Sequence, residues 1–578
     1  MNKSLDRSYR KAFTTAVFFR SSTMMTSFID GILTSIFLGA DAMTAYGIAT
    51  PYFMMNTVLS YALITGGQIL CSSKIGKNRT GEAENVFSTA IWFLFTISAF
   101  VSVAGIVFAE PFARFLGARG DAAYLAPMAA GYLRFLFSGN IFHNFVALSS
   151  GILQMDGGAK LVRASGITAC VTDIVGDLLN IFLFKGGLAG MGAATALSYA
   201  GSAAVLLLYF FRRSRLFSLC PKHIRSRYIP ELFRLGSSQM VYAIASFFGS
   251  TAINRLIISR AGLDVMLGMT VFKNIVLFAN PFCCAVGDAT LLLMGLRIGE
   301  CDRKGVDQVF RDSLRIILRL IPAGLILMLL SRPLAYLYVS DGTAAAVGCV
   351  QTAIIALGVQ IPFTALFLAS AKGLQAFRNS VASSLVNLAK ACILPCGLLL
   401  IFAGLNSVGV FGSLVGAEIL SAVLSTALFH KERTESSLLC IPEKNIIRAE
   451  ISTDAAAVGF SEEVSKFCAE NNLSSKLCYF IPLCVEELSI YLINQGTDNK
   501  SIASGVTVKV VRQDYRITVC FIDNNPLNDL QKRAEEWSLH DEHPEKFIGM
   551  RIALKLAYEF KYIPLMDQNN TILTFEIS

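Results

Sequence analysis

The sequence has few charged residues for its length. Only 16% of its 578 residues are Asp, Glu, Lys or Arg, whereas 54% are hydrophobic and the mean hydropathy is +0.56. Soluble domains carry about 25% charged residues. The composition also excludes a disordered chain, a collagen and a nucleic-acid-coating protein, because each of these is polar or strongly biased. We therefore expect a polytopic membrane protein with no nucleic-acid partner.

Two kinds of binding motif are also missing. The 14 cysteines are scattered, and no C-x-x-C pair meets a second one, so we expect reduced thiols and no metal site. No Gly-x-x-x-x-Gly-Lys phosphate loop is present. The sequence thus predicts no bound metal and no cofactor.

The charges that are present are divided unevenly. Residues 435–578 carry 14 basic and 21 acidic side chains, whereas residues 1–434 carry 36 basic and 20 acidic ones. In a hydrophobic chain, basicity of this kind follows from the preference of Lys and Arg for cytoplasmic loops. We therefore separate a basic membrane part from an acidic C-terminal domain.

Apolar stretches long enough to cross a bilayer recur between Phe13 and His430. We place spans at 13–38, 45–72, 85–109, 123–152, 162–184, 188–211, 232–259, 263–296, 312–339, 344–371, 379–404 and 407–430. The five even-numbered loops carry 17 Lys or Arg, including Lys372 and Arg378 in the tenth, and the odd-numbered loops carry five. This asymmetry predicts a multi-pass protein of the plasma membrane with both termini in the cytoplasm.

The two hydrophobic halves echo each other at an offset near 222 residues. Pro111 after the third span corresponds to Pro333 after the ninth, and Gly151 corresponds to Gly373. Repeats with an even number of spans are related by an axis along the membrane normal. The expected fold is therefore an all-α membrane part of twelve helices in two six-helix lobes, residues 1–220 and 221–433. Two lobes that rock about a shared cavity favour a transporter over a channel or a receptor.

Three segments carry a resemblance to a known family. Residues 27–39 look like a first-span signature, residues 108–118 resemble the corner between spans 3 and 4, and residues 173–194 are similar to a signature of spans 5 and 6. Over about residues 1–434 the chain resembles the multidrug and toxic compound extrusion (MATE) transporters. The resemblance implies a secondary antiporter, not an enzyme, that exports amphipathic and commonly cationic small molecules in exchange for protons or sodium.

Carboxylates inside predicted spans are the main candidates for ion coupling. A charged side chain at the middle of the bilayer costs about 2.5–3.5 kcal/mol on insertion scales. Asp30 lies in span 1, and Asp173 and Asp177 share one face of span 5, with Asn180 one turn further. Like charges this close cannot all stay ionised, so the group predicts a proton site, or a sodium site with oxygen ligands. The MATE resemblance carries over onto Asp30 and Asp177, whereas many members have Asn at Asp173. The alternative is that these residues only hold helices together through hydrogen bonds.

The second half does not repeat the acidic group but holds both signs of charge. Lys390 and Glu418 can pair between spans 11 and 12, and Lys273 can pair with Asp288. The alternative is a basic wall that contacts an anionic group of the substrate.

Two polar residues complete the candidate substrate cavity. Asn254 falls near the position that corresponds to Asp30 in the repeat. His143 in span 4 could relay protons, although a single His on an apolar helix more often packs as a neutral residue.

The composition changes after residue 433. Residues 434–442 have the composition of a linker, and residues 443–578 that of a cytosolic α+β sandwich domain large enough for its own core. Alternation and periodicity predict strands at 446–452, 506–511, 515–523 and 571–577 and helices at 461–471, 475–496 and 544–560.

This order of elements resembles the histidine-kinase/Hsp90-like ATPase fold, in particular its anti-sigma-factor kinase branch. The residues that correspond to its nucleotide site are Glu486, Glu487, Asp523 and Gly549. Tyr491 replaces the Asn expected on the metal-binding helix, and Asn525 replaces a Gly. We therefore expect a degenerate domain without ATPase or kinase activity, with doubtful ATP binding, that regulates transport or docks a cytosolic protein.

Two other functions stay open from the sequence. One is a flippase for a lipid-linked precursor, and the other is a membrane-anchored signalling protein that acts through its kinase-like domain. An acidic cavity would favour a cation exporter and a basic cavity a lipid flippase.

Overall fold

The computed structural model describes residues 3–49, 51–116, 118, 120–211, 215–261, 263–338, 344–402, 406–436, 438, 445–497, 505–513, 515–523, 525, 556–565 and 568–577. The chain forms two compact units. Tyr9–Gln154 and Gly158–Leu438 make up the helical membrane part, and the residues after Leu438 belong to the second unit, the C-terminal domain.

The membrane part is helical in both halves. The first half contains α1 (Lys3–Leu33), α2 (Gly39–Ala49), α3 (Pro51–Gly76), α4 (Thr80–Val107), α5 (Ala109–Leu116), α6 (Ala126–Leu153), α7 (Ala159–Leu179) and α8 (Gly187–Leu207). The second half contains α9 (Ile229–Ala261), α10 (Leu263–Gly299), α11 (Arg303–Leu329), α12 (Ser331–Tyr338), α13 (Ala344–Ala376), α14 (Ser380–Leu388), α15 (Leu394–Phe402) and α16 (Ser407–Glu435). Wider π-helical turns at Thr34–Leu38, Asn180–Phe184 and Ala389–Ile393 continue α1, α7 and α14.

A helical segment lies at each predicted span, but the predicted number of crossings is not confirmed. Within the described ranges, nine helices are long and apolar enough to cross a membrane, and one of them, Ser475–Gln495, belongs to the C-terminal domain. The predicted span 312–339 is wrong in its bounds. The helix α11 begins at Arg303 and ends at Leu329, and Leu330 separates it from α12.

The helix ends agree with the predicted repeat. Val107 at the end of α4 corresponds to Leu329 at the end of α11, and Leu116 corresponds to Tyr338, at an offset of 222 residues in both cases. Each half therefore contains a long helix followed by a short one of eight residues, α5 or α12.

The two halves meet where α3 packs against α9 and α10. A Cβ atom added to Gly236 would lie 1.8 Å from the carbonyl oxygen of Ala62, and one added to Gly76 would lie 2.1 Å from that of Leu296. Only glycine permits backbones to approach this closely. We call the end of the membrane part at Gly76 and Gly299 the closed end.

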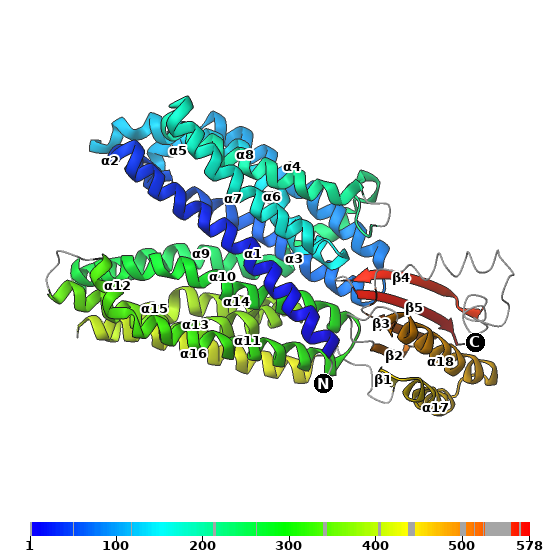
Figure 1. The fold of residues 1–578 in the computed structure, drawn as a ribbon. Coiled ribbons are helices and arrows are strands. Elements are labelled where there is room, and N and C mark those ends of the chain that lie inside the picture. Colours follow the sequence, from blue (N-terminus) through cyan, green and yellow to red (C-terminus); the bar gives the residue numbers. More distant parts are fainter. Residues whose placement is uncertain are drawn as a thin grey trace. The chain divides into compact units, whose positions relative to one another are not determined.

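Polar contacts also link the halves near the closed end. The Tyr9 hydroxyl donates to the carbonyl oxygen of Val286 at 3.0 Å, and Arg378 donates to the Ser73 hydroxyl at 3.0 Å. At the opposite end, α2 and α5 diverge from α12 and α15, as the ribbon in Figure 1 shows. The described contacts between the halves thus hold them together at the closed end, and the ribbons separate toward the opposite end.

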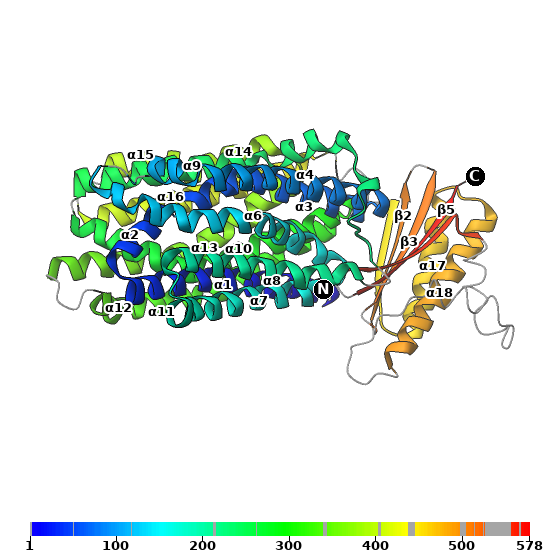
Figure 2. The ribbon, with the colours of Figure 1, turned by 90° about the horizontal axis from the view of Figure 1, so that it is seen from above.

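The C-terminal domain is a two-layer α+β structure. Its elements are β1 (Ile446–Ile451), α17 (Asp454–Glu470), α18 (Ser475–Thr497), β2 (Val506–Gln513), β3 (Arg516–Asp523), β4 (Glu559–Leu565) and β5 (Gln568–Glu576). The strands form an antiparallel sheet in the order β1-β2-β3-β5-β4, with Val510 opposite Val519. Figure 2 shows both helices on one face of the sheet, and residues such as Leu488 and Phe521 form the core between the layers.

Two predicted elements of this domain need correction. α17 begins at Asp454 and not at Ser461, because the Thr453 hydroxyl accepts a hydrogen bond from the Ala456 amide and caps the helix. The helix predicted at 544–560 is wrong at its end, since Glu559 opens β4. Residues 526–555 lie outside the described residues.

Candidate functional site

Three aspartates meet inside the first half of the membrane part. Asp30 comes from α1, and Asp173 and Asp177 come from one face of α7. One carboxylate oxygen of each lies within 4.8 Å of those of the other two. Their exposed fractions are 7%, 1% and 0%, so the group is removed from bulk water. The fold thus brings together the three acids that the sequence marked as candidates.

Most oxygens of these carboxylates have no hydrogen-bond partner in the part of the chain that the structure describes. Oδ1 of Asp30 and both oxygens of Asp173 and Asp177 have no hydrogen-bond partner among the described residues. Three carboxylates at this separation cannot all be ionised, because their mutual repulsion is strong in a buried site. A shared proton relieves the repulsion, and so does a hard cation such as Na⁺, which prefers oxygen ligands.

A cavity of about 140 Å³ lies beside the aspartates. Asp30, Asp173 and His143 line it, and the His143 ring lies 4.8 Å from the ring of Tyr199. The cavity is also lined by Phe19, Arg20, Tyr61, Thr195 and Ser198. The structure therefore places His143 at the same cavity as two of the candidate acids.

Asn180 has a different environment from the aspartates. Its Oδ1 accepts a hydrogen bond from the Gly186 amide at 3.0 Å, and its Nδ2 donates to the Gly187 carbonyl oxygen at 2.9 Å. Gly187 has a positive φ of 59°, as a tight turn before α8 requires. The structural role of Asn180 is to hold this turn, and its place in an ion site stays a prediction.

The pair of Lys390 and Glu418 is confirmed. The Lys390 ammonium contacts the Glu418 carboxylate, and the two side chains are only 13% and 7% exposed. Gln360 also donates to Glu418 at 3.3 Å, and the ammonium lies 4.3 Å from the centre of the Phe367 ring. Lys390 is therefore satisfied within the second half and does not form the basic wall considered as the alternative.

We expect Lys390→Met to lower the free energy of unfolding of the full chain by about 3–5 kcal/mol, because Glu418 would stay buried without its cation. Denaturant unfolding in detergent measures the change. The double variant Lys390→Met/Glu418→Leu should recover most of the loss, and the exposed Lys304→Met serves as the matched control. A single variant as stable as the wild type would contradict the prediction.

The predicted pair of Lys273 and Asp288 is wrong. Lys273 donates to Oδ1 of Asn254 at 2.9 Å, so these two candidate cavity residues bind each other in the second half. Asp288 instead accepts from Nε of Arg20 at 2.6 Å. Arg20 was missed as a site residue, although an arginine inside the first predicted span was a usable signal.

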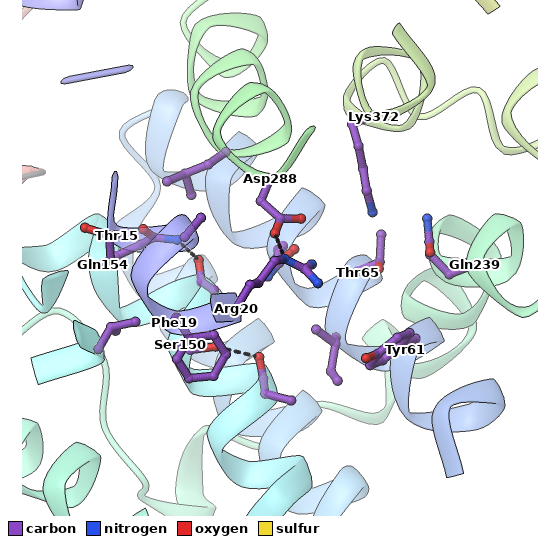
Figure 3. A pocket seen from close by; sticks show the side chains of 17 residues that line it. Thr15, Phe19, Arg20, Tyr61, Thr65, Ser150, Gln154, Gln239, Asp288 and Lys372 are labelled. Carbon is purple, nitrogen blue, oxygen red and sulfur yellow. Dashed lines mark hydrogen bonds and ion pairs between the residues drawn. The ribbon is translucent and has the colours of Figure 1, made fainter. Parts of the chain in front are cut away.

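Lys372 was also placed wrongly. It was assigned to the tenth loop, but α13 continues to Ala376 and carries Lys372 into the membrane part. There it lines a second cavity, of about 150 Å³, together with Arg20 and Asp288 (Figure 3).

In the C-terminal domain, Asp523 lies at the end of β3 and is 1% exposed. One of its oxygens accepts from the Asn525 amide at 2.9 Å and from Nδ2 of Asn569 at 2.8 Å. Burial raises the pKa of this carboxyl, and the two hydrogen bonds oppose the shift. Asn525 in turn donates to the Leu492 carbonyl oxygen at 2.8 Å. The predicted adenine acceptor is therefore held by contacts of the domain itself.

The other predicted nucleotide residues on α18 have the following environments. Glu486 on α18 accepts from the Ser461 hydroxyl at 2.9 Å, and Glu487 is the next residue on the same helix. The Tyr491 hydroxyl accepts from Gln495 within α18. Gly549 lies outside the described residues.

Comparisons with known proteins agree with this architecture. Residues 16–179 match the MatE family model, and this segment contains all three aspartates. A solved structure of MATE in the straight conformation matches with a TM-score of 0.69 and 18% identity, over 74% of this chain and 96% of that one. The membrane part has the MATE fold. An outward-facing structure of a multidrug resistance MATE family transporter matches with a TM-score of 0.68 and 19% identity, over the same shares of the two chains.

The relatives found by sequence match a smaller part of the chain. The multidrug export protein MepA of Staphylococcus aureus is 25% identical over 237 residues, which are 39% of this chain and 51% of MepA. The chain thus spans about half the length of the curated relatives it matches. The family-model match ends at residue 179, and these comparisons give no support to the ATPase-like resemblance of the C-terminal domain.

Proposed function

We propose that this chain is a secondary active antiporter of the MATE type. It exports amphipathic compounds, cations among them, in exchange for protons or sodium ions. The observation that supports this function is the buried group of Asp30, Asp173 and Asp177, in which five of the six carboxylate oxygens lack a hydrogen-bond partner among the described residues. The likeness to MepA, a multidrug export protein by name, points in the same direction.

Exchange follows from competition for the same negative charge. A proton or Na⁺ on the carboxylates neutralises the pocket, and a cationic group of the substrate neutralises it equally well. Occupation by one therefore weakens binding of the other, which is the coupling that antiport requires. Because Asp30 is on α1 and Asp177 on α7, occupation also changes the repulsion between these two helices.

The charges at the closed end give the proposed orientation. Lys74, Lys77 and Arg79 lie at the end of α3 or directly after it, and Arg297 and Arg378 lie at the corresponding ends in the second half. Lys and Arg of this kind favour the cytoplasmic side. The closed end then faces the cytoplasm, the conformation is open to the outside, and rocking of the halves gives alternating access.

Transport in inverted membrane vesicles tests this function. Vesicles that contain the full chain should accumulate a fluorescent cation such as ethidium when a proton gradient or a sodium gradient is imposed, each in a separate experiment. The gradient that drives uptake identifies the coupling ion. If neither gradient drives uptake by correctly inserted protein, the proposed function is wrong.

For the C-terminal domain we propose a regulatory or docking role with a cytosolic protein. Asp523 is held by Asn525 and Asn569, and Tyr491 stands where the resemblance requires a metal ligand. A neutral phenol is a poor ligand for Mg²⁺, which prefers charged or carbonyl oxygens.

We expect the purified full chain to hydrolyse no ATP and to bind it no more tightly with Mg²⁺ than with a chelator. The reason is that without a metal ligand the triphosphate charge is not neutralised beside Glu486 and Glu487. Calorimetric titration with ATP in the two buffers measures the difference. Micromolar binding that requires Mg²⁺ would show that the site is intact.

A flippase for a lipid-linked precursor stays a second candidate, because the membrane part has a basic cavity as well as an acidic one. Arg20 and Lys372 both line this second cavity. A lipid-linked phosphate would need such a site.

A further inference from the structure

The second cavity lies between the two halves of the membrane part. Its walls come from α1, α3, α6 and α7 of the first half and from α9, α10 and α13 of the second. Three of the residues that line it are charged, namely Arg20, Asp288 and Lys372. Its volume of about 150 Å³ is enough for several water molecules or for a small charged group.

The charges in this cavity do not balance. Arg20 uses Nε to bind Asp288 at 2.6 Å, and its terminal nitrogens have no partner among the described residues. The Lys372 ammonium likewise has neither a hydrogen bond nor an ion pair within the described ranges. Two cations thus share one carboxylate. The side chains of Arg20 and Asp288 are 36% and 24% exposed, so the cavity carries an excess of positive charge that an anion entering from solvent can reach.

The two cations face the same space. Figure 3 shows the Lys372 side chain extending into the cavity, with its ammonium turned toward the region occupied by the guanidinium of Arg20, and Thr65 and Gln239 border this region. The free nitrogens of an arginine bind carboxylate or phosphate oxygens in pairs, and a lysine adds a point charge. Thr65 and Gln239 can supply neutral hydrogen bonds.

We propose that this cavity binds the carboxylate or phosphate group of the transported compound between Arg20 and Lys372. The inference rests on the proposed export function and specifies its substrate class. Because Arg20 belongs to one half and Lys372 to the other, the bound group bridges the halves and favours the conformation with the closed end shut.

The site lies next to the acidic one. Both cavities are lined by Phe19, Arg20, Tyr61 and Ala147. Arg20 and Asp30 are ten residues apart on α1, which is about 15 Å along the helix axis. An amphipathic zwitterion of this length reaches both charges, with its cationic group at the aspartates and its apolar body against Phe19 and Tyr61.

Ligand binding without any gradient tests the proposal. The full chain in nanodiscs of phosphatidylcholine is titrated with phenyl phosphate, with benzoate and with benzyl alcohol, and the midpoint of thermal unfolding is followed. We expect the two anions, and not the neutral alcohol, to raise the midpoint. Lys372→Gln should weaken apparent anion binding at least tenfold, and Lys372→Arg should retain it. Lys304→Gln removes one positive charge at an exposed position. It is the matched control and should bind the anions as the wild type does.

A second arm separates the two sources of the anionic group. In this arm the soluble anions are left out, and part of the phosphatidylcholine is replaced by phosphatidic acid. Stabilisation by this lipid alone, lost in Lys372→Gln, assigns the site to a lipid head group. If the wild type responds to no anion, or if Lys372→Gln responds as the wild type does, the proposal is overturned. Anion binding that depends on Lys372 in a protein without cation efflux would refute only the proposed export of cations.

Discussion

Asp177→Asn is expected to reduce gradient-driven cation uptake into inverted vesicles to the level of protein-free vesicles. An amide has the shape of a carboxyl group, but it takes up no proton at neutral pH and has no negative charge to hold a cation. Asp177 is fully buried, and neither of its oxygens has a partner among the described residues, so the change breaks no hydrogen bond. The amount of folded protein should therefore stay the same while transport is lost.

The exposed Asp41→Asn, on α2 of the same half, is the matched control and should transport normally. Asp30→Asn and Asp173→Asn in the same assay tell whether all three carboxylates are required. Uptake at the wild-type rate by Asp177→Asn would remove the basis for placing the coupling ion at this site.

Gly236→Ala is expected to open the closed end. The added Cβ atom would overlap the Ala62 carbonyl oxygen, so α3 and α9 must separate. Overpacking of this kind costs about 1–3 kcal/mol, which shifts the balance between conformations by about 5–150-fold. Transport should fall, since the outward-open conformation becomes too rare.

Double electron–electron resonance measures this shift as the distance between spin labels that replace Lys77 and Arg303. Both residues are exposed near the closed end. The population with a long distance should grow in Gly236→Ala. Gly412→Ala is the matched control, since a Cβ atom there meets nothing within 4 Å. Unchanged distances and unchanged transport in Gly236→Ala would mean that the close contact is not needed for closure.

Features that depend on local periodicity were predictable from the sequence. The spacing of Asp173 and Asp177 places both on one face of their helix, whatever the position of that helix in the fold. Lys390 and Glu418 lie in neighbouring spans, and a buried cation needs a nearby anion. The repeat followed from matched glycines and prolines at helix ends.

Features that depend on long-range packing were not predictable. Arg20 and Asp288 are 268 residues apart, and nothing in the sequence selects this pairing over that of Lys273 with Asp288. Lys372 was taken for a loop residue because the predicted span ends at residue 371, whereas α13 continues to Ala376 and has 33 residues. In the C-terminal domain, β4 contains Pro564 and has no regular alternation of polar and apolar residues, so its sequence does not indicate a strand. Its pairing with β5 at the edge of the sheet decides its conformation.

The apolar character of α18 has a consequence for biosynthesis. This helix leaves the ribosome after the membrane part and is hydrophobic enough to be inserted as a further crossing. Its proper partner, the sheet, is incomplete at that moment, because 26 residues separate the end of α18 from the end of β3. At about 5–20 residues per second, the helix waits about 1–5 s for this strand. Glu486 and Glu487 oppose insertion during the delay, since acidic side chains enter the bilayer poorly. On this view the two carboxylates that resemble part of a nucleotide site have a role in biosynthesis, because they disfavour insertion of α18.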